Sequence, residues 1–118
     1  MVALLLILAG LAMPYEREGD FTIRFEPMAV LQTGAPIPFH IKVEDARHKP
    51  VSDAKVTMQI ETTDHKQVEK FKAVSIGEGV YTAKPVFSDA VEWIVLVEVH
   101  REDQVSARSI NFIVSNGQ

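Results

Sequence analysis

The sequence predicts an all-β domain that follows an apolar N-terminal segment. Three observations support this prediction. Over most of the 118 residues apolar side chains stand at every second position, residues that favour turns separate these runs, and residues 2–13 contain no charged or polar side chain. An alternation with period two places the apolar side chains on one face of a strand, where a sheet can bury them.

The clearest strands are three runs in the first half of the chain, where polar residues alternate with apolar ones that share a face. The apolar members are Phe21, Ile23 and Phe25; Phe39, Ile41 and Val43; and Val56, Met58 and Ile60. Weaker patterns predict strands over residues 68–74 and 80–86. A last strand is expected over residues 105–114, with Ile110, Phe112 and Val114 on one face.

Residues 91–99 form a different pattern. Trp93, Val95, Val97 and Val99 share one face, and the opposite face is also apolar because it carries Ile94 and Leu96. This predicts a central strand that is covered on both sides. A buried helix over residues 91–101 is the alternative, and the many β-branched residues favour a strand.

Turn-forming residues lie between the expected strands. They include Pro27, the Gly-Ala-Pro-Ile-Pro stretch at 34–38, Pro50, Gly77-Glu78-Gly79, Ser88-Asp89 and Glu102-Asp103-Gln104. About seven strands with this spacing are typical of an immunoglobulin-like antiparallel β-sandwich. A small closed barrel is the nearest alternative fold.

Residues 1–13 are predicted to be a signal peptide or a membrane anchor, and residues 14–118 the folded domain. A membrane-spanning helix needs about 20 residues, so the shorter run 2–13 suits the apolar part of an export signal, which Gly10-Leu11-Ala12 would close as a small-x-small cleavage site. A buried strand or helix of the domain is a third interpretation. Both membrane interpretations place the chain from Tyr15 onward outside the cytoplasm, in the cell envelope or anchored to the membrane.

Composition excludes several classes of protein. The chain has no cysteine, so disulfides, thiolate metal sites, thiol nucleophiles and lipid attachment at cysteine are excluded. Its net charge is −4, with twelve basic residues scattered among sixteen acidic ones. No nucleic-acid partner is expected, because binding to phosphates requires a concentrated basic surface.

A family resemblance rests on three short stretches. The chain resembles the YtkA-like/FixH-like domains of bacterial exported or membrane-tethered proteins in these stretches. They are Asp45-Ala46-Arg47-His48-Lys49-Pro50-Val51-Ser52-Asp53-Ala54-Lys55-Val56, then Gly79-Val80-Tyr81, and then Trp93 in an apolar strand. The resemblance runs from about Pro38 to Val114. It implies a β-sandwich outside the cytoplasm, and some such domains are associated with respiratory oxidase assembly or copper handling.

The resemblance also raises a copper hypothesis. Many relatives carry Met and His together after the third strand and before the last, as thioether and imidazole ligands for copper. Here residues 61–65 keep His65 without a methionine, and residues 102–108 have neither donor. The remaining candidate metal ligands are His65, His40, His100 and Met28. His40 and His100 would approach each other if their strands shared a sheet, whereas His48 is expected in an exposed turn and Met58 in the core.

Three classes of function follow. The favoured one is a non-catalytic module outside the cytoplasm that binds a protein partner or a membrane complex, through a sandwich face or an edge strand and without a cofactor. The alternative is a copper-handling or other metal-binding exported protein. An enzyme is the least favoured class, because the chain lacks a Gly-x-Ser-x-Gly elbow and a His-Glu-x-x-His pair.

Overall fold

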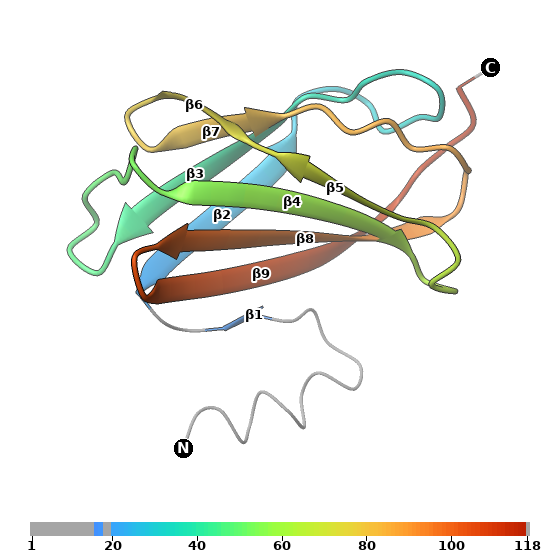
Figure 1. Ribbon diagram of the computed structural model, residues 1–118. Coiled ribbons are helices and arrows are strands. Elements are labelled where there is room, and N and C mark those ends of the chain that lie inside the picture. Colours follow the sequence, from blue (N-terminus) through green and yellow to red (C-terminus); the bar gives the residue numbers. More distant parts are fainter. Residues whose placement is uncertain (1–15, 18–19, 118) are drawn as a thin grey trace.

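The computed structural model describes residues 16–17 and 20–117, which fold into two antiparallel β-sheets packed face to face (Figure 1). The five-stranded sheet contains, in spatial order, β1 (Glu16–Arg17), β9 (Gln104–Ile113), β8 (Glu92–Arg101), β4 (Lys55–Thr62) and β5 (Val68–Lys72). The four-stranded sheet contains β2 (Phe21–Pro27), β3 (Phe39–Asp45), β7 (Val80–Ala83) and β6 (Val74–Gly77). The predicted all-β sandwich is confirmed.

The described residues contain nine strands where the sequence predicted about seven. One addition is the two-residue β1, which pairs with β9. The other arises because the single strand expected over residues 68–74 is divided between the sheets. The Ala73 amide still donates to the Val56 carbonyl of the five-stranded sheet (2.9 Å), and the next residue, Val74, pairs with β7 of the other sheet.

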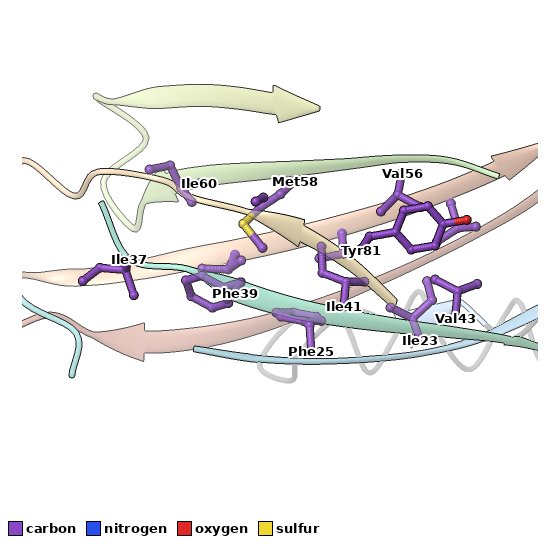
Figure 2. Packing of buried hydrophobic residues seen from close by; sticks show 14 of the residues in the cluster. Ile23, Phe25, Ile37, Phe39, Ile41, Val43, Val56, Met58, Ile60 and Tyr81 are labelled. Carbon is purple, nitrogen blue, oxygen red and sulfur yellow. The ribbon is translucent and has the colours of Figure 1, made fainter. Parts of the chain in front are cut away.

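The core lies between the two sheets and is built from the alternating residues that the sequence singled out. Figure 2 shows side chains from β2, β3 and β4, together with Tyr81 of β7, pointing into this space. Met58 is fully buried, as expected. Trp93 is also buried, with its ring edge-on to Phe87 (5.3 Å between centroids) and its Nε1 donating to the Asp89 carbonyl (2.9 Å). A large aromatic with a satisfied polar atom is well suited to a core.

One prediction about β8 is wrong in part. The strand is central, because it pairs with β9 on one side and β4 on the other. Its outer face is not fully covered, however, since Ile94 and Leu96 are only half-buried. Apolar residues on both faces of a strand therefore did not require a layer of structure on both faces.

The two ends of the sandwich differ in composition. The turns that join β3 to β4, β6 to β7 and β8 to β9 lie at the end opposite the C-terminus (Figure 1) and are rich in charged residues. We call this the charged end. The other end contains the segments 28–38, 85–91 and 113–117, in which Asp89 is the only charged residue. We call these three segments the apolar end.

Backbone hydrogen bonds join the three segments of the apolar end. Thr33 donates to the Ser115 carbonyl (3.0 Å), Gly34 to the Phe87 carbonyl (3.1 Å) and Val114 to the Val91 carbonyl (3.1 Å). The segments are therefore one connected structure and not independent loops. Within the described ranges there is no helix with the length and apolarity needed to span a membrane. The predicted signal peptide or anchor, residues 1–13, lies outside the described residues.

Candidate functional site

The candidate metal ligands lie on separate elements. His40 is exposed on the outer face of β3, and His100 is half-buried on β8. These strands belong to different sheets, so the condition under which the two histidines would approach each other, a shared sheet, is not met. Met28 is half-exposed in the segment that follows β2. In the described part of the chain, no three His, Cys, Asp or Glu side chains cluster in a way that could hold a metal ion.

His65 has the most defined surroundings of the four candidates. It occupies the turn between β4 and β5 with a left-handed backbone (φ 64°), and its Nδ1 lies 2.6 Å from Oε2 of Glu61. A carboxylate on one ring nitrogen fixes the orientation of an imidazole, as it does behind many metal-bound histidines. The neighbouring Asp64 accepts hydrogen bonds from Thr62 Oγ1 (2.7 Å) and the Lys66 amide (3.0 Å), which lower the pKa of its carboxyl. These hydrogen bonds hold the Asp64 carboxylate within the turn.

Asp45 plays a similar part at the charged end. Its carboxylate accepts from the backbone amides of Lys49 (3.0 Å) and Arg47 (2.8 Å), and these bonds lower the pKa of the carboxyl. Local hydrogen bonds of this kind define Asx turns. Asp45 also lines an open hollow of about 350 Å³, together with Arg101, whose guanidinium lies 3.1 Å from Asp53 Oδ1.

Two of the three stretches that carry the family resemblance, residues 45–56 and 79–81, lie at the charged end. Gly79 has φ 77°, and a Cβ there would lie 2.7 Å from the Val43 carbonyl oxygen, so only glycine fits. Tyr81 is buried, and its hydroxyl donates to the Val51 carbonyl (2.8 Å) and accepts from the Ala54 amide (3.1 Å). These motif residues therefore close the connection between β3 and β4.

The two edges of the four-stranded sheet differ, and sequence reasoning found neither property. At the β2 edge, Arg108 Nη1 donates to the Ile23 carbonyl (2.8 Å) and the Phe21 amide donates to Ser106 Oγ (3.0 Å). Side chains of β9 thus occupy polar groups of the β2 backbone that point out of the sheet. Such capping blocks the addition of another strand.

The β6 edge is open in the described structure. No hydrogen bond from another backbone segment reaches its outer side within residues 16–17 and 20–117. Val74 and Ile76 are 63% and 54% exposed. The neighbouring edge, β5, is different because it carries Glu69, Lys70 and Lys72, and charged residues discourage pairing. The sequence signal for the open edge was Val74 and Ile76, two apolar residues separated by one serine.

The four-stranded sheet also carries an open hollow of about 340 Å³ on its outer face. Arg24 and Lys42, which lie directly opposite each other on β2 and β3, contribute to its lining along with His40. Like charges in this position repel each other. The hollow lies over β2 and β3 and reaches Val80 of β7, so it is on the side of the sheet away from β6.

Comparison with known families agrees with the predicted resemblance. A family model described as YtkA-like matches residues 16–98. The match begins and ends earlier in the chain than the stretch that carries the resemblance, which runs from about Pro38 to Val114. It spans β1 to β7 and most of β8. No curated protein matches the chain.

Proposed function

The chain belongs to the YtkA-like family, and on that premise we propose that it is a non-catalytic module outside the cytoplasm that binds an extended segment of another protein. The family is generally found outside the cytoplasm, which supports the proposed location in the cell envelope. The binding site of the proposal is the open edge formed by β6.

The observation that carries this proposal is the contrast between the two edges of one sheet. The β2 edge is capped by Arg108 and Ser106. The β6 strand has no further strand on its outer side in the described residues, its Gly77 amide donates to its own Ser75 Oγ (3.3 Å), and it adds the exposed side chains of Val74 and Ile76. An exposed edge of this kind pairs with an extended peptide through main-chain hydrogen bonds, and side-chain contacts give specificity.

The geometry of β6 favours a short and reversible contact. The strand has four residues, and its pairing with β7 shifts by one residue between Ser75 and Gly77. Such a bulge bends the edge and interrupts regular pairing. The partner would therefore add a strand of few residues and obtain further contact area from the outer face of the sheet.

Local structure supports a non-catalytic role. Asp45 lines the hollow at the charged end, where a general acid or base would be sought. Turn hydrogen bonds account for the lowered pKa of its carboxyl, so the shift needs no catalytic explanation. Arg101 in the same hollow is engaged by Asp53 and lies over the Phe21 ring (5.3 Å to the centroid).

The edge is tested by site-specific photo-cross-linking in cells that export the chain. A cross-linker in place of Ile76 should form a discrete adduct, and one in place of Thr22 on the capped β2 strand should not. Val74→Lys, which places a charge on the edge, should abolish the adduct at position 76. Equal adducts at both positions, or an adduct that survives Val74→Lys, would show that this edge is not the binding site.

The location is tested separately by fractionation. The protein should be recovered with the cell envelope, either with a mature N-terminus near Met13 or as an uncleaved protein that resists carbonate extraction. Recovery of the full-length protein in the cytosol would exclude a function outside the cytoplasm.

A second candidate function is copper handling. The observation in its favour is the 2.6 Å contact between Glu61 and His65, which orients an exposed imidazole. Within the described residues, His65 is not part of a group of three or more His, Cys, Asp or Glu side chains that could hold a metal ion. We therefore propose it only as the alternative, and a copper titration tests it.

A further inference from the structure

Exposed apolar side chains gather at one end of the sandwich. Of the eight large apolar side chains that are exposed in the described part of the chain, five belong to the apolar end. They are Met28, Val30, Val86, Val91 and Ile113. Val30 and Ile113 are 75% and 78% exposed. Concentrations of exposed apolar residues mark surfaces that meet a partner or a membrane.

The same segments carry almost no charge. Residues 28–38 and 113–117 contain no charged residue, and Asp89 in the segment 85–91 accepts a hydrogen bond from Gln67 Nε2 of the neighbouring turn. Transfer of a charged side chain into an apolar phase is costly. The three segments of the apolar end largely avoid that cost, and the charges at this end of the sandwich lie in the neighbouring β4–β5 turn, which carries Asp64 and Lys66.

Backbone polar groups at the apolar end are also satisfied internally. The amides of Thr33, Gly34 and Ile37 donate to carbonyls of the adjacent segments, and the Leu31 carbonyl accepts from both the amide and the hydroxyl of Ser115. In a lipid environment each unsatisfied backbone group costs several kcal/mol. The groups that make these internal bonds can approach lipid without that cost.

The direction of β1 relates the N-terminal segment to this end. Glu16 pairs with Arg108 and Arg17 with Ala107, so β1 runs antiparallel to β9. Since β9 runs toward the apolar end, β1 runs away from it, and Glu16 is the residue of β1 nearer to that end. Fifteen residues precede Glu16, and they include the uncharged run 2–13.

We propose that the apolar end of the sandwich rests on a lipid bilayer, with Val30 and Ile113 in contact with lipid and the charged end directed into water. The contact is shallow, at the boundary of headgroups and acyl chains, where exposed apolar side chains insert. Asp64 and Lys66 of the β4–β5 turn lie at the same end of the sandwich, which suits headgroup depth. The proposal rests on residues 2–13 remaining attached and entering the membrane, and it does not depend on the β6 edge.

The absence of cysteine makes the orientation measurable. Single cysteines replace Val30 or Ile113 at the apolar end, and Ala46 or Asp103 at the charged end, all exposed positions. The full chain is labelled with an environment-sensitive fluorophore and reconstituted in phosphatidylcholine vesicles with brominated acyl chains. We expect loss of most of the fluorescence at positions 30 and 113 and none at 46 and 103. Failure to bind the vesicles, equal quenching at all four positions, or no quenching at 30 and 113 would overturn the proposal.

A pair of double variants separates this surface from the proposed protein-binding edge. Val30→Asp with Ile113→Asp should remove most of the quenching of a fluorophore at position 91 of the apolar end, because two apolar contacts are lost and two charges are added while residues 2–13 still hold the chain on the vesicle. Val74→Asp with Ile76→Asp makes the same chemical change at the β6 edge and should leave the quenching at position 91 unchanged. An equal reduction in both variants would contradict a specific lipid contact. Cross-linking of position 113 to a membrane protein in native envelopes, without quenching in pure lipid, would assign the surface to a protein and overturn the proposal.

Discussion

The two ends of this sandwich are held together by different physical means. At the charged end, side chains bond to backbone: Asp45 closes its own turn, and Tyr81 joins Val51 to Ala54. At the apolar end, backbone bonds to backbone across three segments, and aromatic side chains such as Trp93 and Phe87 pack beneath them. The charged end gathers turns rich in charged residues, and the apolar end gathers most of the large apolar side chains that are exposed in the described residues.

The comparison also locates the family motifs. The stretch from Asp45 to Val56 and the Gly79-Val80-Tyr81 triplet build the charged end, whereas Trp93 supports the apolar end. Each of these residues has a structural role in the described contacts. The surfaces proposed for binding, by contrast, consist of exposed residues such as Val74 and Val30 that no motif includes.

The largest expected effect is at the apolar end. Trp93→Ala should lower the free energy of unfolding by about 3–5 kcal/mol, the usual range for deleting a large buried aromatic. The loss includes the edge-on contact with Phe87 and the hydrogen bond to the Asp89 carbonyl. Urea unfolding followed by circular dichroism measures it. Glu92→Ala is the control, because that side chain is exposed on the same strand. Equal losses in the two variants would contradict the facing of β8.

At the charged end, removal of the Tyr81 hydroxyl should cause a smaller loss in the free energy of unfolding. Tyr81→Phe keeps the ring and leaves the Val51 carbonyl and the Ala54 amide without their partner. Leaving buried polar groups unpaired costs about 1–3 kcal/mol. The same urea experiment measures this loss. Thr82→Val, which removes a hydroxyl from the next residue on the outer face of β7, should change stability little. A Tyr81→Phe variant as stable as the parent would show that these hydrogen bonds do not hold the charged end.

The strands and their facing were largely predictable from the sequence because they depend on local alternation. Trp93 and Met58 were placed in the core correctly, since period-two patterns fix the face of a strand. The division of residues 68–74 between two sheets was not predictable. The alternation continues through Ala73, while the hydrogen-bonding partner changes from β4 to β7.

Contacts between strands that are distant in the sequence were also not predictable from local alternation. Whether His40 and His100 share a sheet could not be decided from the sequence, because strand pairing joins residues that are far apart in the chain. The cap on β2 joins Arg108 to Ile23, which are 85 positions apart. No local pattern reports such a contact. The candidate ligands stay a prediction, and their separation became evident only from the fold.

A still smaller effect is expected for the Asp45 turn at the charged end, in the pH dependence of the stability of the protein. Turn hydrogen bonds lower the pKa of Asp45. A carboxyl whose pKa is lower in the folded than in the unfolded state adds stability above the unfolded pKa, and that stability disappears as pH falls through the folded pKa. Asp45→Asn keeps an acceptor oxygen and removes the titration. The drop in urea midpoint between neutral pH and about pH 3 should therefore be smaller in the variant.

The control for this measurement makes the same charge change elsewhere. Asp103→Asn lies in the β8–β9 turn, where the described structure gives the Asp103 carboxylate no hydrogen bond. Its urea midpoint should fall with pH as in the parent. Asp64→Asn, at the other end of the sandwich, should behave like Asp45→Asn because turn hydrogen bonds lower that pKa too. A flatter response in Asp103→Asn than in Asp45→Asn would reject this explanation.

The smallest expected effect concerns copper and uses a matched pair of histidines, one at each end. His48 and His65 both have φ 64°, and each has a glutamate four residues earlier, at 3.8 Å from His48 and 2.6 Å from His65. A single imidazole with one carboxylate is a poor copper site, since tight binding needs several soft or nitrogen donors. We expect weak binding of Cu(I) and Cu(II) in a titration against a competing chelator, changed little by His65→Ala or His48→Ala. Submicromolar, stoichiometric binding that is lost in His65→Ala and kept in His48→Ala would establish the metal function. The shorter contact to Glu61 would then be the feature that separates the two turns.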